Sequence, residues 1–167
     1  MISTCHRHTL LQLPAVGVLI TAVTTYKRCC LDDPRSAHCV TSEIAYCEAR
    51  GWVHSLAWVV MPDHVHWLLQ LKEGSLNACM AVFKARSERA IQQAVDRAER
   101  VWQAGYYERR VRGSESLLGM ARTILANPLR RGLVERIDHY PYQFSAWKEP
   151  VAAGNPGRRA AAGRHPP

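Results

Sequence analysis

Two apolar runs separated by only two residues constrain this chain more than any other feature. Val53–Met61 (VHSLAWVVM) and His64–Leu71 (HVHWLLQL) are rich in the β-branched and aromatic residues that favour strands. Pro62 and Asp63, which lie between them, are typical turn residues. A connection this short joins neighbouring strands that run in opposite directions, because parallel strands need a long crossover. The sequence therefore predicts an antiparallel β-hairpin over residues 53–71.

Periodic patterns on both sides of this hairpin predict the remaining elements. They are a strand over 17–25, a helix over 35–50 that ends at Gly51, a helix over 75–95, a strand over 101–112 and a helix over 115–126. The residue before a proline avoids helical geometry, so Asn127-Pro128 should end the last helix. This order of elements predicts an α+β fold in which helices pack on a mainly antiparallel sheet.

The length of 167 residues fits one domain with a hydrophobic core. We expect an irregular lead-in at 1–15, a single domain at 16–148 and a flexible basic tail at 149–167. No apolar run is long enough to span a membrane, and the stretch over 10–23 fits a buried first strand better than an export signal. The six cysteines form no C-x-x-C pair, so we expect free thiols in a cytoplasmic protein.

The net charge of +8 and the pI near 9.5 favour a polyanionic partner. The segment from Lys84 to Arg136 contains twelve Lys and Arg residues against six Asp and Glu residues, so it carries +6 of the total. Most of these cations are arginines, whose planar guanidinium group suits phosphate recognition. A solvated basic surface is the alternative, but the charge favours nucleic-acid binding.

The motif His64-Val65-His66 is the sharpest candidate for chemistry. On a strand, side chains two residues apart point to the same face, so the two imidazoles should lie side by side while Val65 points to the opposite layer. Such a pair can bind a metal ion, although two histidines at this spacing are more often incidental. The preceding strand should supply an apolar floor beneath the pair, made by Trp58, Val59 and Val60.

Two further motifs combine aromatic or polar residues with arginines. The segment Trp102–Arg109 (WQAGYYER) could stack bases and grip phosphates as single-strand binders do, or it could be ordinary strand core. The segment Asn127–Leu133 (NPLRRGL) is by itself most simply a helix end followed by a turn. Neither motif alone assigns a function.

Three blocks stand in a distinctive order and spacing. They are Ser55–Leu71 (SLAWVVMPDHVHWLLQL), Val101–Arg112 (VWQAGYYERRVR) and Ala121–Val134 (ARTILANPLRRGLV). Together they resemble the REP-associated tyrosine transposases, domesticated relatives of the insertion-sequence single-tyrosine (HUH) transposases. The resemblance covers residues 15–147. It implies a ferredoxin-like HUH domain, a divalent Mg²⁺ or Mn²⁺ ion, single-stranded DNA or a DNA hairpin as partner, and a monomer or homodimer.

The resemblance also assigns roles to individual residues. In the family, two histidines and a third polar ligand hold the ion, and a helix-borne tyrosine attacks the phosphorus to form a phosphotyrosine link. His64 and His66 match the histidine pair, and Asn127 matches a polar position whose amide could complete the metal shell. The residues expected to contact DNA are Lys84, Arg86, Arg89, Tyr106, Arg109, Arg110, Arg112, Arg130 and Arg131.

The sequence departs from the family at the nucleophile. The tyrosine is expected four residues before the Asn of Asn-Pro, and Thr123 occupies that position. A threonine hydroxyl is a poorer nucleophile than a phenol and is shorter by the whole ring. Tyr106 and Tyr107 are the nearest other tyrosines, but they lie on a predicted strand. Three functions stay open: a transposase that cleaves and rejoins DNA, an inactive protein that only binds hairpins, and a hydrolase that uses water at a metal ion.

Overall fold

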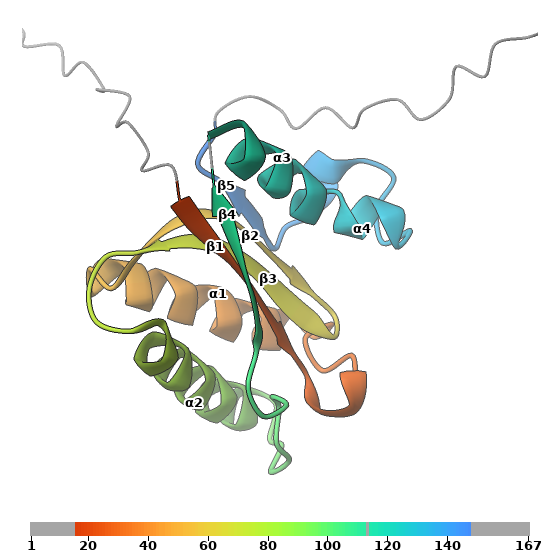
Figure 1. Cartoon of the computed structure of the whole chain (residues 1–167). Coiled ribbons are helices and arrows are strands. Elements are labelled where there is room, and N and C mark those ends of the chain that lie inside the picture. Colours follow the sequence, from red (N-terminus) through yellow and green to blue (C-terminus); the bar gives the residue numbers. More distant parts are fainter. Residues whose placement is uncertain (1–15, 113, 148–167) are drawn as a thin grey trace, which may run out of the picture.

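The computed structural model describes residues 16–112 and 114–147, which form one sheet with helices on both faces (Figure 1). The strands are β1 (Val16–Val23), β2 (Val53–Met61), β3 (His64–Leu71), β4 (Tyr107–Arg112) and β5 (Gln143–Ser145). The α-helices are α1 (Pro34–Ala49), α2 (Leu76–Ala94), α3 (Ser114–Leu125) and α4 (Asn127–Arg130). All strand pairs are antiparallel, in the order β4-β1-β3-β2-β5, so the predicted α+β fold is confirmed. The predicted lead-in and the tail at 149–167 lie outside the described residues.

The two long helices begin within one residue of their predicted starts because each has a capping side chain. The carboxylate of Asp33 accepts a hydrogen bond from the Arg35 amide (2.8 Å), and Pro34 suits the first helical position of α1. The hydroxyl of Ser75 accepts from the Ala78 amide (3.2 Å) at the start of α2. Within the described part of the chain, no helix is both long and apolar enough to cross a membrane.

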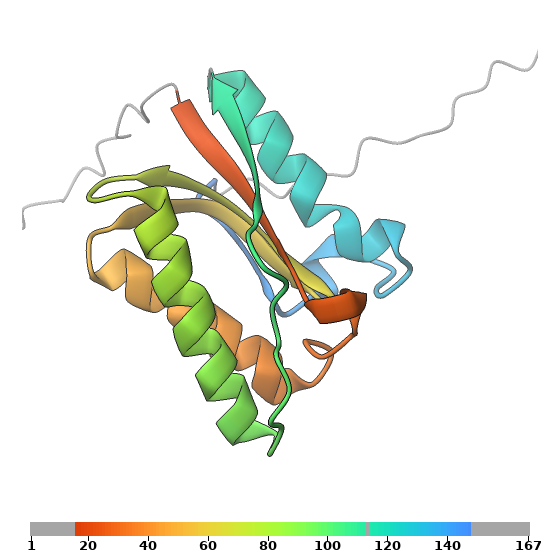
Figure 2. The same ribbon diagram turned by 60° about the horizontal axis from the view of Figure 1, so that its bottom comes forward.

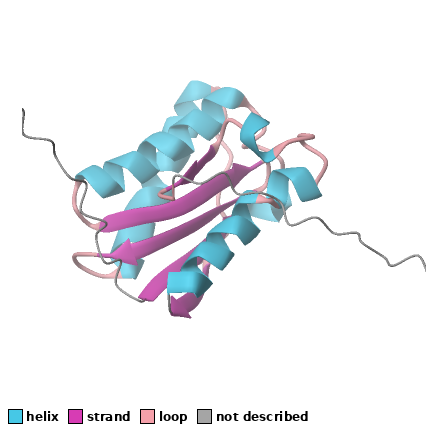
Figure 3. Cartoon of the chain, turned by 90° about the horizontal axis from the view of Figure 1, so that it is seen from above, coloured by secondary structure: helices cyan, strands magenta, loops and turns pink. Residues whose placement is uncertain are grey.

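The sheet separates two apolar clusters. On one face, α1 and α2 lie side by side across the strands (Figure 2) and cover Val65, Trp67 and Leu69 of β3. On the other face, α3 covers Leu68 of β3 together with Val59 of β2. Figure 3 shows the helices on both sides of the strands. Successive residues of β3 thus alternate between the clusters, which explains why this strand reads as a nearly continuous apolar run.

The strand predicted over 101–112 is wrong in its first half. Only its second half forms β4, and Trp102 makes an isolated bridge beyond the end of β1. Between these points the chain leaves the sheet at Gly105, whose φ of +69° lies in the left-handed region that glycine tolerates. Trp102 is buried beneath α2, where its indole nitrogen donates to Ser87 Oγ (3.0 Å). The aromatic residues that suggested a strand are therefore partly helix-packing residues.

Three smaller differences concern the ends of elements. β1 stops at Val23, two residues early, because the chain enters a turn in which Tyr26 and Lys27 have φ values of 55° and 53°. The helix predicted over 115–126 is followed by a further helical turn, α4, because proline is tolerated in the first turn of a helix. The edge strand β5 is absent from the prediction, since three residues are too few to show a period.

Candidate functional site

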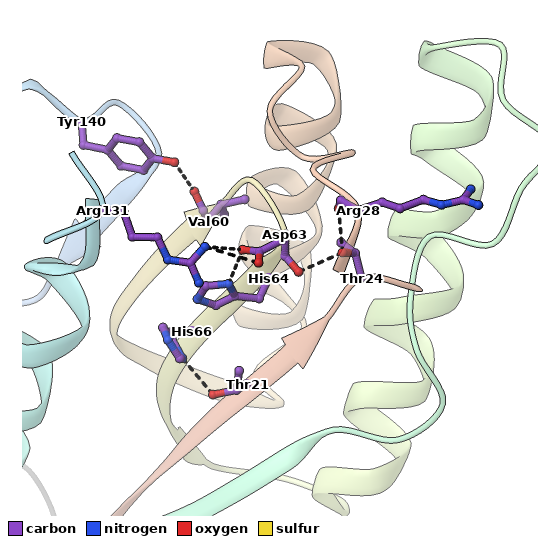
Figure 4. Close-up of polar contacts among 9 residues, drawn as sticks. All are labelled: Thr21, Thr24, Arg28, Val60, Asp63, His64, His66, Arg131 and Tyr140. Carbon is purple, nitrogen blue, oxygen red and sulfur yellow. Dashed lines mark hydrogen bonds and ion pairs between the residues drawn. The ribbon is translucent and has the colours of Figure 1, made fainter. Parts of the chain in front are cut away.

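His64 and His66 lie side by side on the sheet face that α3 covers, as the strand period predicts (Figure 4). Their rings meet edge to face, with the ring centroids 4.6 Å apart. Val65 between them points into the opposite cluster, beneath α1 and α2. His64 is buried and His66 is partly exposed, so the pair can be approached from one side. Two imidazoles this close can bind one ion.

The apolar floor beneath the pair differs from the predicted one. The hairpin register sets Met61 and Val59 directly opposite the two histidines, so these side chains share their face. Trp58 and Val60 belong to the cluster on the other face. The expectation is confirmed for Val59 and wrong for Trp58 and Val60, because neighbouring residues of a strand face opposite sides.

Each histidine is held through its Nδ1 atom. Asp63 Oδ1 lies 2.6 Å from His64 Nδ1, and Thr21 Oγ1 lies 2.8 Å from His66 Nδ1. An ionised carboxylate only accepts, so His64 Nδ1 carries the proton and His64 Nε2 keeps its lone pair. Asp63 is itself fixed, because its main-chain carbonyl accepts from both the amide and the hydroxyl of Thr24 (2.9 Å each). Partners of this kind orient histidines that bind metals.

The protonation states of the site suit a metal ligand. Burial lowers the pKa of His66 to about 4, and the neighbouring His64 and two arginines act in the same direction. Burial also lowers the pKa of His64, against the opposing effect of Asp63. Burial alone would raise the pKa of Asp63, but the hydrogen bond from His64 and the charge of Arg131 lower it. Both imidazoles are therefore neutral at pH 7, which is the form that coordinates metals.

Cationic side chains converge on the same place. Arg131 Nη1 lies 3.4 Å from each carboxylate oxygen of Asp63, which links the end of α4 to the hairpin turn (Figure 4). The charge of Arg130 acts on His66, and that of Lys27, from the turn after β1, acts on His64. This concentration of positive charge next to neutral imidazoles favours an anionic group such as a phosphate.

The junction of α3 and α4 carries the two positions that the family motif singles out. Thr123 is exposed, and its hydroxyl donates to the Gly119 carbonyl one turn earlier (2.9 Å). Arg130 Nη2 donates to the Thr123 carbonyl (2.8 Å) and to the amide oxygen of Asn127. Thr123 and Asn127 therefore lie on one side of the helical segment, where Arg130 connects them.

Some residues expected to contact DNA have partners within the fold. Lys84 Nζ donates to two main-chain carbonyls of the loop before β4. Arg86 Nε pairs with Glu43 of α1 (2.6 Å), and the Tyr106 hydroxyl donates to Asn77 of α2. These contacts tie α2 to its neighbours, so the positive charge of the segment is partly structural.

The other residues expected to contact DNA divide between the two faces of the sheet. Arg109 is paired with Leu19, whose neighbour on β3 is Leu68, so it shares the face of the histidines. Arg110 and Arg112 lie on the opposite face of β4, because neighbouring strand residues alternate between faces. Arg89 is exposed on α2, the helix that covers that opposite face. Of the expected set, only Arg109, Arg130 of α4 and Arg131, which directly follows α4, thus lie on the histidine face.

Two functional candidates were not expected from the sequence: Asp63 and Thr21, which orient the histidines. Tyr107, named above only as a neighbouring tyrosine, stands in the same row of the sheet as His66, because Thr21 pairs with both. Tyr107 is 69% exposed. The position of Asp63 directly before His64 was a readable signal, whereas the pairing of Thr21 depends on a strand 45 residues away.

The described residues contain no group of three His, Cys, Asp or Glu side chains placed to hold a metal ion. The histidine pair therefore offers two nitrogen ligands. Further ligands would have to be oxygen atoms of another kind, such as an amide, a water molecule or a phosphate.

Comparison with known proteins agrees with this architecture. Residues 6–119 match the family model of the IS200-like transposases. The chain is 28% identical over 100 residues to the REP-associated tyrosine transposase of Escherichia coli K12, which covers 59% of this chain and 56% of that protein. It is 25% identical over 99 residues to a Haemophilus influenzae protein of the same class, with 53% and 56% covered. The chain thus spans about half the length of these curated relatives.

A solved structure of a REP-associated tyrosine transposase bound to a REP hairpin is similar in fold. The TM-score is 0.63 at 18% identity, with 96% of this chain and 100% of that chain covered. At this identity the likeness shows the fold alone. The family model, by contrast, matches the sequence from before β1 into α3 and includes the histidine pair. The chain therefore belongs to the IS200-like transposase family.

Proposed function

We propose that this protein binds DNA hairpins with single-stranded ends and acts on them at a divalent Mg²⁺ or Mn²⁺ ion held by His64 and His66. The observation that carries this proposal is the pair of neutral imidazoles, each fixed at Nδ1, beside Arg130 and Arg131. Imidazoles attract a cation and arginines attract a phosphate, so the combination suits a metal-bound phosphodiester. A relative of the same fold binds a REP hairpin, which supports the same class of partner.

Each residue of the site has a separate role toward the ion or the DNA. His64 and His66 would hold the ion through their Nε2 atoms, and a bound ion would polarise the scissile phosphate and stabilise the leaving oxygen. Asn127 offers its amide oxygen as a third ligand, weaker than a carboxylate and already accepting from Arg130. Arg109, on the same face, contacts the DNA backbone. Because the partner is DNA, we infer a cytoplasmic location.

The family reaction cleaves and rejoins a DNA strand through a phosphotyrosine, and the side chain at position 123 decides whether this protein performs it. The Thr123 hydroxyl is directed to the Gly119 carbonyl of its own helix. This observation favours a second candidate function, in which the protein binds hairpins without cutting them. Tyr107 is the first alternative nucleophile, because it shares a row of the sheet with His66.

A cleavage assay separates these functions. A labelled DNA hairpin is incubated with Mn²⁺ and either the wild-type protein or Thr123→Tyr, and the products are resolved on a denaturing gel. If the nucleophile has been lost, only Thr123→Tyr cuts the strand and becomes covalently attached to it. Thr123→Phe is the matched control, since it adds the ring without the hydroxyl. A wild-type adduct that disappears in Tyr107→Phe assigns the nucleophile to Tyr107 instead.

Binding is tested separately, by salt and by metal. Each phosphate contact contributes about −0.9 to the slope of log affinity against log salt, so Arg130→Ala should make the slope shallower by about one. A divalent ion should raise the Tm of the wild-type protein and leave that of His64→Ala unchanged. Affinity that stays flat between low and moderate salt contradicts DNA binding by these arginines. A Tm rise that persists in His64→Ala places the ion elsewhere.

A further inference from the structure

The hydrogen-bonded pairing of β1 with β4 is interrupted beside the histidine pair. Thr21 is the last β1 residue paired with β4, where it faces Tyr107, and the Gln103 amide then donates to the Val23 carbonyl (2.9 Å). Between these two points a single β1 residue lies opposite three residues, 104–106, of the segment that leads into β4. The surplus residues bow away from the sheet and leave a pocket with a cavity volume of about 190 Å³.

The loop that forms this pocket, residues 103–106, is held in place from outside. Lys84 Nζ donates to the carbonyls of Gln103 and Gly105 (2.7 Å to Gly105). The Tyr106 hydroxyl donates to Asn77 of α2. Gly105 lies in the left-handed region, with open space around the position of a Cβ. Because a helix clamps the loop from behind, the pocket is preformed, and a ligand loses little free energy in ordering it.

The pocket shares a wall with the metal-binding candidate. Thr21 lines the pocket and also holds His66 through its hydroxyl. Tyr107, Thr21 and His66 stand in one row across three adjacent strands. At a strand spacing of about 4.8 Å, Tyr107 lies about 10 Å from His66. That distance equals roughly three nucleotides stacked at 3.4 Å, and fewer in an unstacked strand.

We propose that this pocket receives one unstacked nucleobase of the DNA strand whose phosphate lies at the histidine pair. The inference rests on the DNA-binding function proposed above. Tyr107 presents an exposed ring at the rim, which can stack on a base because every base has a π-face. The amides of Ala104 and Gly105 have no acceptor among the described residues, so they are free to donate to a base edge. The pocket thereby sets which phosphate reaches the two histidines.

A coupled test uses DNA with missing bases. The probe is a fluorescently labelled hairpin with thymidine overhangs, in which one abasic site is moved along the overhang. Binding of the wild-type protein should weaken roughly five- to hundredfold at one position, which is the effect expected for one stacked base. Tyr107→Ala should weaken binding to the intact probe by a similar factor and should no longer respond to that abasic position.

Further variants separate the pocket from general effects. Tyr107→Phe keeps the ring and should retain most of the affinity, whereas Ala104→Leu should fill the cavity and reproduce the loss. Phe144→Ala is the matched control, since Phe144 is an exposed aromatic on the far edge of the sheet and packs on Trp58 of the other face. Equal responses of Tyr107→Ala and wild type to every abasic position overturn the pocket while leaving hairpin binding intact. Absence of wild-type binding to any probe refutes the DNA-binding function itself.

Discussion

Replacing Asp63 by alanine tests how the histidine pair is held. Asp63 is 8% exposed and lies 2.6 Å from His64 Nδ1. A buried hydrogen bond to a charged group contributes about 1.5–3 kcal/mol. The contact with Arg131 is longer, 3.4 Å, and that arginine is half exposed, so it adds less than about 1 kcal/mol. We expect Asp63→Ala to lower the free energy of unfolding by about 2–3 kcal/mol.

The effect on metal binding should be larger than the effect on folding. Without the carboxylate, the His64 ring is free to rotate and to carry its proton on either nitrogen, so affinity for Mn²⁺ should fall about 10–100-fold. Asp63→Asn keeps an acceptor oxygen without the charge and should give an intermediate value. Calorimetric titration with Mn²⁺ measures the affinity, and urea unfolding followed by the fluorescence of the buried Trp67 and Trp102 measures stability.

A matched control distinguishes the loss of this particular carboxylate from the loss of any charge. Asp138 also pairs with an arginine, Arg136 (2.7 Å), but both side chains are largely exposed. Asp138→Ala should therefore change the free energy of unfolding by no more than about 0.5 kcal/mol and leave Mn²⁺ affinity unchanged. Wild-type Mn²⁺ affinity in a folded Asp63→Ala protein would refute the idea that Asp63 orients a metal ligand.

Other predictions concern the scaffold around the site. A Cβ added in Gly17→Ala would lie 2.6 Å from Leu117 Cδ2 under α3, so overpacking should reduce stability by about 1–3 kcal/mol, and an unchanged urea midpoint would contradict this. Ser87→Ala removes the buried acceptor of the Trp102 indole and should lower stability by about 1–3 kcal/mol in the same assay. Burial raises the pKa of Tyr140 to about 12, so the folded state keeps a proton that the unfolded state loses near pH 10. Stability should therefore decline as the pH rises from about 10 to 12, and Tyr140→Phe should not show that decline.

The parts of the fold that the sequence predicted well are those fixed by local physics. The hairpin and its two histidines follow from strand periodicity and a two-residue turn, and β2 and β3 have their predicted bounds. The helix starts follow from the side chains of Asp33 and Ser75, which cap their own helices. Each of these features depends on residues a few positions apart, so a short stretch of sequence is enough to predict it.

The parts that were missed depend on contacts between distant segments. The first half of the strand predicted over 101–112 does not form, because Trp102 is buried under α2 and Lys84 holds the neighbouring loop through its main-chain carbonyls. Charge alone could not separate Arg86, which pairs with Glu43 of α1, from an arginine free for DNA. The orienting role of Thr21 required the register of β1 against β3. Sequence reasoning therefore found the histidine pair but not the residues that hold it.

The position of β1 between β3 and β4 has a consequence for how a newly made chain folds. Both partners of β1, the strands β3 and β4, follow it in the chain and are synthesised later. Thr21 can contact His66 only after another 45 residues have been synthesised, and it can pair with Tyr107 only later still. Such non-local pairings form slowly, so an apolar strand stays open to chaperones and to aggregation during translation. The β2–β3 hairpin can form early, but His66 gains its hydroxyl partner only when β1 inserts, which makes a competent site one of the last products of folding.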